Sequence, residues 1–106
     1  MRLYPAAAMV LLSFSSLLYA SSKAQREHGA QVYAGSGCQH CHTLRAVGGH
    51  KGPDLSSVGR TKSKTEIRNQ IVYGSKVMPE FGDILEQAEL NDLVAYLRSC
   101  RDKPRK

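Results

Sequence analysis

The most informative stretch in this chain of 106 residues is Cys38-Gln39-His40-Cys41-His42. On a helical turn, residues three and four positions apart lie on the same face. Cys38, Cys41 and His42 have this spacing, so two thiols and one imidazole converge on a single object. The two residues between the cysteines point elsewhere. The motif therefore predicts a group that both sulfurs and the ring nitrogen hold from one side.

Cys-x-x-Cys-His is the attachment signature of c-type haem, in which the thiols add to two vinyl groups and the imidazole meets the iron. A structural zinc site would need a second pair of ligands, and Cys100 with one other His is a poor pair. A dithiol redox motif would need a strand before it and a helix after it. The motif favours one haem c bound through Cys38 and Cys41, with His42 as an iron ligand.

The N-terminus has the pattern of an export signal. Arg2 is the only charge before Lys23, an apolar run covers residues 6–18, and small residues follow at 20–24. This order is typical of a secretory signal peptide. We expect residues 1–20 to be removed, with cleavage near 20–24, which predicts a periplasmic protein. The alternative is an uncleaved membrane anchor, because the uncharged stretch 3–22 is barely long enough to span a bilayer.

The remaining chain is small for a self-sufficient apolar core. The whole sequence contains two Phe and no Trp, and its three Cys cannot form several disulfides. A large bound cofactor is the natural supplement to such a core.

The chain is basic, with 15 Lys and Arg against 9 Asp and Glu. Five of the basic residues lie at its end: Arg98, Arg101, Lys103, Arg105 and Lys106. Export argues against nucleic acid as the partner. The basic end is either a solvated, frayed terminus or a surface that steers the protein toward an acidic redox partner.

Periodicity and stop signals predict helices and no sheet. A first helix over 22–34 ends before Gly35, and a second follows Ser63, which forms a capping-box pattern with Glu66, and stops at Gly74. The last helix, about 86–101, has apolar residues at 90, 93, 94 and 97. Residues 44–64 have a loop-like composition. We expect one all-α domain over 25–102, followed by a basic tail, 103–106.

These features resemble the class I cytochrome c family, in particular its short bacterial periplasmic members, over about residues 27–101. In that family a Gly and an aromatic residue four apart on the first helix cross an apolar-x-x-aromatic pair on the last. Gly29 with Tyr33, and Leu93 with Tyr96, match these two patterns. The resemblance implies the cytochrome c fold, with about three to five short helices packed around one covalently bound haem.

The resemblance also implies roles for two loop residues. Gly52-Pro53-Asp54-Leu55 resembles the segment whose proline carbonyl accepts the proximal imidazole N–H, so Pro53 takes that role behind His42. Met78, which precedes Pro79 in a late loop, matches the second axial ligand. His28, His50 and Lys76 are weaker candidates for that position. The last helix lacks the usual Ser, Thr or Asp cap, although its first turn carries Glu86 and Glu89.

Cys100 is additional to the family pattern. It is either a partly buried thiol or a surface thiol able to form a disulfide between two copies of the chain.

Ligation by His42 and Met78 would leave the iron no vacant position for a substrate. The leading hypothesis is therefore a periplasmic one-electron carrier, not an enzyme, whose partners are redox proteins with acidic docking surfaces. The first alternative is a dedicated or membrane-anchored electron-accepting subunit of a respiratory dehydrogenase or oxidase. The second is a five-coordinate haem sensor, which requires that Met78 does not bind iron. A membrane partner is expected only if the signal stays uncleaved.

Overall fold

The computed structural model describes residues 23–104, so the predicted signal peptide and the last two residues lie outside it. The described chain is mostly helical, as expected for an all-α protein. Its helical elements are a helix over residues 23–35, the 3-10 helix η1 (Cys38–His40), α2 (Val58–Thr61), α3 (Lys64–Tyr73) and α4 (Gln87–Arg98). Within this part of the chain no helix is long and apolar enough to cross a membrane.

The helix boundaries follow local capping. Ser63 Oγ accepts the N–H of Glu66 at 3.1 Å, while the Glu66 carboxylate accepts the N–H of Ser63 at 2.9 Å, so α3 begins with the predicted capping box. At the start of α4, the Glu89 carboxylate accepts the N–H of Glu86 at 3.0 Å. Glu89 thus caps a helix that has no Ser, Thr or Asp at its start. This helix ends at Arg98, three residues before the expected end.

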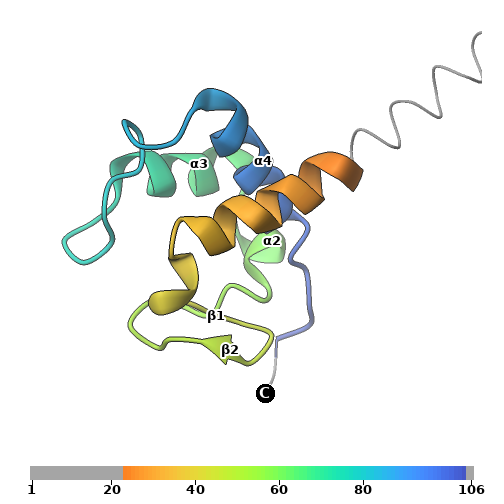
Figure 1. Cartoon of the computed structure of the whole chain (residues 1–106). Helices are drawn as coiled ribbons and strands as arrows, with labels where there is room; N and C mark the ends of the chain where they lie inside the picture. Colours follow the sequence, from red (N-terminus) through yellow and green to blue (C-terminus); the bar gives the residue numbers. More distant parts are fainter. Residues whose placement is uncertain (1–22, 105–106) are drawn as a thin grey trace, which may run out of the picture.

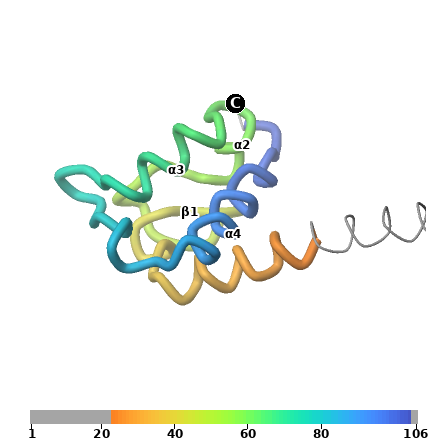
Figure 2. The backbone as a smooth tube through the Cα atoms, turned by 90° about the horizontal axis from the view of Figure 1, so that it is seen from above, coloured from red at the N-terminus to blue at the C-terminus, as the bar shows by residue number. Residues whose placement is uncertain are grey.

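The helix over 23–35 crosses α4, and Gly29 permits the crossing (Figures 1 and 2). A Cβ atom added to Gly29 would lie only 2.6 Å from the Cβ atom of Tyr96. Beside the crossing, the rings of Tyr33 and Tyr96 pack edge to face, with centroids 5.9 Å apart. The predicted contact between the first and last helices is therefore confirmed.

The core forms where these helices meet α3. Its buried residues are Val32, Tyr33, Ile67, Ile71, Leu90, Leu93, Val94 and Leu97. Burying each large apolar side chain contributes about 1.5–3 kcal/mol, but the conformational entropy lost on folding offsets most of this gain, so this small cluster gives the fold limited stability of its own.

Residues 43–61 contain three elements, two strands and a helix, where a loop and no sheet were expected. Strands β1 (Thr43–Leu44) and β2 (Val47–Gly48) pair antiparallel, and α2 follows. The strands are too short to show alternation. Arg45 and Ala46 form the turn between the two strands and have φ values of 50° and 68°. Gly or Asn usually occupies turn positions with such positive φ values. The sequence pattern therefore did not predict the hairpin.

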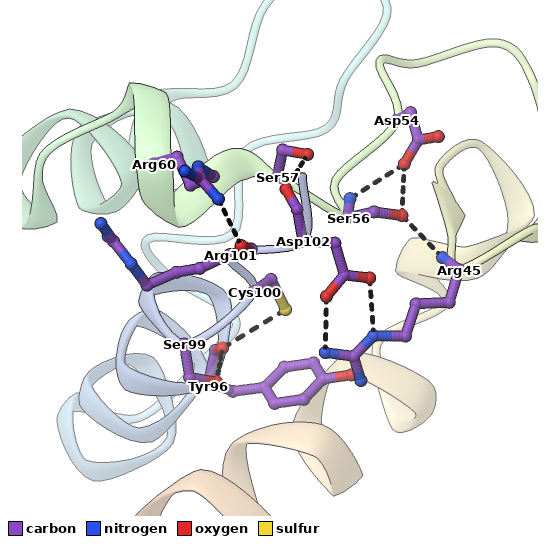
Figure 3. A network of polar contacts seen from close by, with 10 residues as sticks. All are labelled: Arg45, Asp54, Ser56, Ser57, Arg60, Tyr96, Ser99, Cys100, Arg101 and Asp102. Atoms are coloured by element: carbon purple, nitrogen blue, oxygen red, sulfur yellow. Dashed lines mark hydrogen bonds and ion pairs between the residues drawn. The ribbon is translucent and has the colours of Figure 1, made fainter. Parts of the chain in front are cut away.

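After α4 the chain folds back over α2, and we call residues 98–102 the C-terminal strap (Figure 3). Gly59 donates its N–H to the carbonyl of Cys100 at 2.8 Å. The Arg98 guanidinium donates to the carbonyls of Gly59 and Lys62 at 2.9 and 3.0 Å. Such contacts rule out a frayed terminus over these residues.

The strap also reaches the hairpin turn (Figure 3). Asp102 donates its backbone N–H to Ser56 at 3.0 Å, and its carboxylate accepts from Arg45 Nε at 3.1 Å. Cys100 is 1% exposed and donates its thiol hydrogen to the carbonyl of Tyr96 at 3.5 Å. Of the two alternatives for Cys100, the surface thiol is therefore wrong, because tertiary packing encloses the side chain.

Candidate functional site

The cysteine motif winds as one helical turn. The N–H groups of Cys41 and His42 both point to the carbonyl of Cys38, at 3.3 and 3.0 Å. Cys38 and His42 line an apolar cavity, while Cys41 is half-buried and does not contribute to its lining. The folded chain thus brings Cys38 and His42, but not Cys41, to the lining of one cavity.

The cavity lies between elements that are far apart in sequence. Its other lining residues are Tyr33, Ser36, Leu55, Ile71, Met78, Phe81, Leu93 and Leu97. The first helix, α3, α4 and two loops all contribute. His42 and Met78, which are 36 positions apart in the chain, therefore share one apolar cavity.

The loop after the motif orients the imidazole of His42. His42 Nδ1 donates its hydrogen to the carbonyl of Pro53 at 2.8 Å, the contact that the resemblance implied. Two backbone hydrogen bonds bring the loop back to the motif. Gly52 donates its N–H to the carbonyl of Cys41 at 2.7 Å, and Leu55 donates its N–H to the carbonyl of Thr43 at 2.8 Å. A Cβ atom at Gly52 would lie 2.6 Å from the ring of His42. Nε2 is then the nitrogen that keeps a lone pair for a metal.

A closed loop carries Met78. Ser75 donates its N–H to the carbonyl of Met78 at 2.9 Å, and its hydroxyl accepts the N–H of Met78 at 3.2 Å. Phe81 then donates its N–H to the carbonyl of Ile71 at 3.0 Å, which returns the loop to α3. These bonds hold Met78 half-buried against the cavity.

Gln70, on the helix before this loop, was not predicted from the sequence as part of the site. Gln70 Nε2 lies 3.7 Å from Met78 Sδ, within hydrogen-bonding distance for sulfur. No motif singles out a glutamine on the exposed side of a short helix, so only the folded loop reveals the contact.

The residues present fit a porphyrin. Thiols, an imidazole and a thioether are the ligand types used for haem attachment and haem iron, and most of the cavity wall is apolar. Tyr33 lines the cavity, and its buried hydroxyl has no hydrogen-bond partner. A buried donor without a partner destabilises the fold by about 1–3 kcal/mol. A haem propionate could accept the hydrogen bond of this hydroxyl. Burial raises the pKa of Tyr33 to about 12, so this hydroxyl stays a donor at neutral pH.

The two rival interpretations of the cysteines find no support. Burial raises the pKa of Cys38, whereas a reactive dithiol needs a thiol pKa below its ordinary value. Among residues 23–104, no group of three His, Cys, Asp or Glu side chains could hold a metal ion.

The weaker ligand candidates are surface residues. His28 is exposed and pairs with Asp92, with Nδ1 and Oδ2 2.6 Å apart. His50 is exposed, and its Nδ1 lies 3.2 Å from the hydroxyl of Thr43. Lys76 is also exposed. None of the three lines the cavity.

Comparisons with known proteins point to one kind of protein. The family model described as "Cytochrome C oxidase, cbb3-type, subunit III" matches residues 24–97. Cytochrome c6 of Diacronema lutheri is 31% identical over 80 residues, which cover 68% of this chain and 92% of that protein. No solved structure matches the chain significantly.

Proposed function

This chain belongs to the family of c-type cytochromes. We propose that it is a periplasmic one-electron carrier and that His42 and Met78 are the ligands of its haem iron. Membership of the family implies a covalently bound haem c and a role in electron transfer. The axial ligands, the thioether residues Cys38 and Cys41, and export are the parts that we add.

One observation carries the choice of ligands: His42 and Met78 line the same apolar cavity, and the other nitrogen of His42 already donates to Pro53. When bound, haem supplies an iron that alternates between its ferric and ferrous states. Pro53 fixes the tautomer and orientation of His42 and raises its basicity. Ligation by the thioether of Met78 would favour the ferrous state and raise the reduction potential.

The surroundings of the cavity suit electron transfer rather than catalysis on a substrate. Apolar side chains from α3 and α4 keep water away, and hydrogen-bonded loops hold both proposed ligands. Rigid ligands keep the geometry similar in the two redox states, so little reorganisation accompanies the gain or loss of an electron. Two ligands also leave no position open for a substrate.

The ligand assignment is tested by spectroscopy and electrochemistry of the holoprotein, made in a host that matures cytochromes. We expect a reversible one-electron couple and the ferric methionine–iron charge-transfer band at neutral pH. Met78→Ala should abolish the band, and Val77→Ala should keep it, because the Val77 side chain is 83% exposed. Carbon monoxide binding by the undenatured wild-type protein would instead support a five-coordinate sensor.

The attachment assignment has its own test. Acid extraction should leave haem on the wild-type chain and on Cys100→Ser, since Cys100 lies outside the cavity lining. Cys38→Ser and Cys41→Ser should each lose the double attachment and yield less holoprotein. Haem that is fully extracted from the wild-type chain would refute covalent binding. Mass spectrometry of the same samples reports whether the mature chain begins near residues 21–25.

A second candidate is a dedicated electron-accepting subunit of a respiratory oxidase or dehydrogenase, which the description of the matching family model favours. Such a subunit would co-purify with its enzyme from native membranes, whereas a carrier would be recovered in the periplasmic fraction. In either case the basic residues favour partners with acidic docking surfaces, so we expect the association rate to fall as ionic strength rises.

A further inference from the structure

Basic side chains gather where the C-terminal strap covers α2 (Figure 3). Arg98 and Arg101 both donate from their guanidinium groups to the carbonyl of Gly59, and Lys103 lines one surface cleft together with Thr61. Positive charges from two distant segments are thus held side by side. We call this cluster the strap face, and its members are Arg60, Lys62, Lys64, Arg98, Arg101 and Lys103.

The charge of the strap face is not balanced. Within residues 58–64 and 98–103 the only carboxylate is that of Asp102, which pairs with Arg45. No member of the strap face forms an ion pair with a carboxylate in the described part of the chain. The sequence then continues with Arg105 and Lys106. Because like charges repel one another, an anionic partner would relieve the repulsion on this face.

The acidic residues lie elsewhere. Residues 77–97 contain five Asp and Glu and no Lys or Arg. Figures 1 and 2 place the loop after α3 and the C-terminal strap at opposite ends of the fold. No member of the strap face lines the cavity that holds His42 and Met78. An anionic surface would therefore attract the strap face and turn the acidic segment away.

The strap face also lacks the apolar centre of a protein interface. The large exposed apolar side chains among the described residues, Val47, Tyr73, Val77 and Ile84, all lie outside it. Protein interfaces usually bury apolar and aromatic side chains at their centre, whereas a layer of anionic lipid headgroups attracts clustered Lys and Arg by charge alone. We propose that the strap face docks the protein on the surface of an anionic phospholipid membrane.

This contact needs no signal peptide and leaves the cavity lining uncovered. Each Lys or Arg near an anionic surface strengthens binding about fivefold, and guanidinium N–H groups can donate to lipid phosphates. Salt screens such attraction, with a Debye length of about 10 Å at 0.1 M. A salt wash should therefore release the docked protein from membranes, whereas an uncleaved membrane anchor would stay in them.

The experiment measures sedimentation of the holoprotein with vesicles of phosphatidylglycerol and phosphatidylcholine. The test variant carries Lys62→Gln, Lys64→Gln and Lys103→Gln, and should bind about 100-fold more weakly than the wild type. The matched control carries the same change at Lys23, Lys51 and Lys76, which are exposed and lie outside the strap face. It loses the same net charge and should bind nearly as tightly as the wild type. Vesicles of phosphatidylcholine alone should bind none of the three proteins.

If the test variant does not accumulate as holoprotein, Lys62→Gln combined with Lys103→Gln serves instead and should weaken binding about 25-fold. Equal losses in the test and control variants would overturn the inference, since net charge alone would then explain the binding. A wild-type protein that ignores anionic vesicles but binds polyglutamate through the strap face would assign the face to an acidic protein instead. Displacement from vesicles by inorganic phosphate at matched ionic strength would likewise refute a membrane surface, because a single phosphate would then suffice.

Discussion

Arg45 and Ala46 adopt a backbone conformation that their side chains disfavour. Both have positive φ values at the turn between β1 and β2, and neither is Gly or Asn. Each such residue costs roughly 1–2 kcal/mol. The fold offsets this cost with neighbouring contacts, since Arg45 donates its N–H to Ser56 Oγ at 2.7 Å and its guanidinium to Asp102.

Ala46→Gly should therefore stabilise the protein. The free energy gained by removing the strain of the left-handed conformation exceeds the entropic cost of ordering a glycine. We therefore expect the free energy of unfolding to rise by about 0.5–1 kcal/mol. Denaturant titration of the holoprotein measures it. The same substitution at Ala95, inside α4, should cost about 1 kcal/mol. Equal losses at the two positions would contradict the assigned turn conformation.

At the scale of elements, the crossing of the first helix over α4 depends on a missing side chain. Gly29→Ala would push a Cβ atom into the backbone of Asp92 and into Tyr96. We expect a loss of about 1–3 kcal/mol, typical of overpacking, measured by thermal and denaturant unfolding. Gly35→Ala is the control, because a Cβ atom there would meet nothing within 4 Å. If both variants were equally stable, the helices would not cross at Gly29.

The start of α3 predicts a dependence on pH. Hydrogen bonds from the backbone and side chain of Ser63 lower the pKa of Glu66 below its ordinary value of 4.5. A lowered pKa stabilises the fold above the ordinary pKa, and this contribution is lost as pH falls through the folded-state pKa.

Glu66→Gln should accordingly melt below the wild type at pH 7, and the difference should shrink as the pH falls below 4.5. Differential scanning calorimetry of both proteins across this range tests the effect. The matched control is Glu80→Gln, which removes an exposed carboxylate outside any helix cap. A difference that grew toward acid pH would contradict the capping role.

At the scale of the whole molecule, the C-terminal strap connects α4 to the hairpin and to the loop that carries Pro53 (Figure 3). Asp54 accepts from the N–H and the hydroxyl of Ser56, and Ser56 accepts from Arg45, which pairs with Asp102. The end of the chain thus supports the side of the site where His42 is oriented.

Arg98→Gln should destabilise the whole domain, because the half-buried guanidinium bridges the carbonyls of Gly59 and Lys62. Hydrogen bonds from a charged group each contribute about 1.5–3 kcal/mol, and we expect a loss near the lower end of that range in chemical denaturation. Lys103→Gln removes an exposed charge beyond the strap and should change stability by less than about 0.5 kcal/mol. A similar loss from both variants would indicate a general charge effect.

Much of this molecule follows from local rules that act within a few residues. The helical turn through Cys38 and His42, the capping box at Ser63 and the apolar stripe of α4 depend on neighbours in the sequence, and each was predicted. The resemblance added the partner of His42, and the hydrogen bond to Pro53 is present. The family comparisons confirm that the chain is a c-type cytochrome with haem c.

Other features depend on contacts between distant segments. The burial of Cys100, the strap over α2 and the turn at Ala46 have no local signature, because α4, α2 and the hairpin must pack before they form. The contact of Gln70 with Met78 requires a closed loop. Short-range geometry specifies the cofactor motif and the main helices, so both could be predicted from the amino-acid sequence alone. The hydrogen bonds that hold the ligand loops could be found only in the folded chain, because they join residues that are far apart in the sequence.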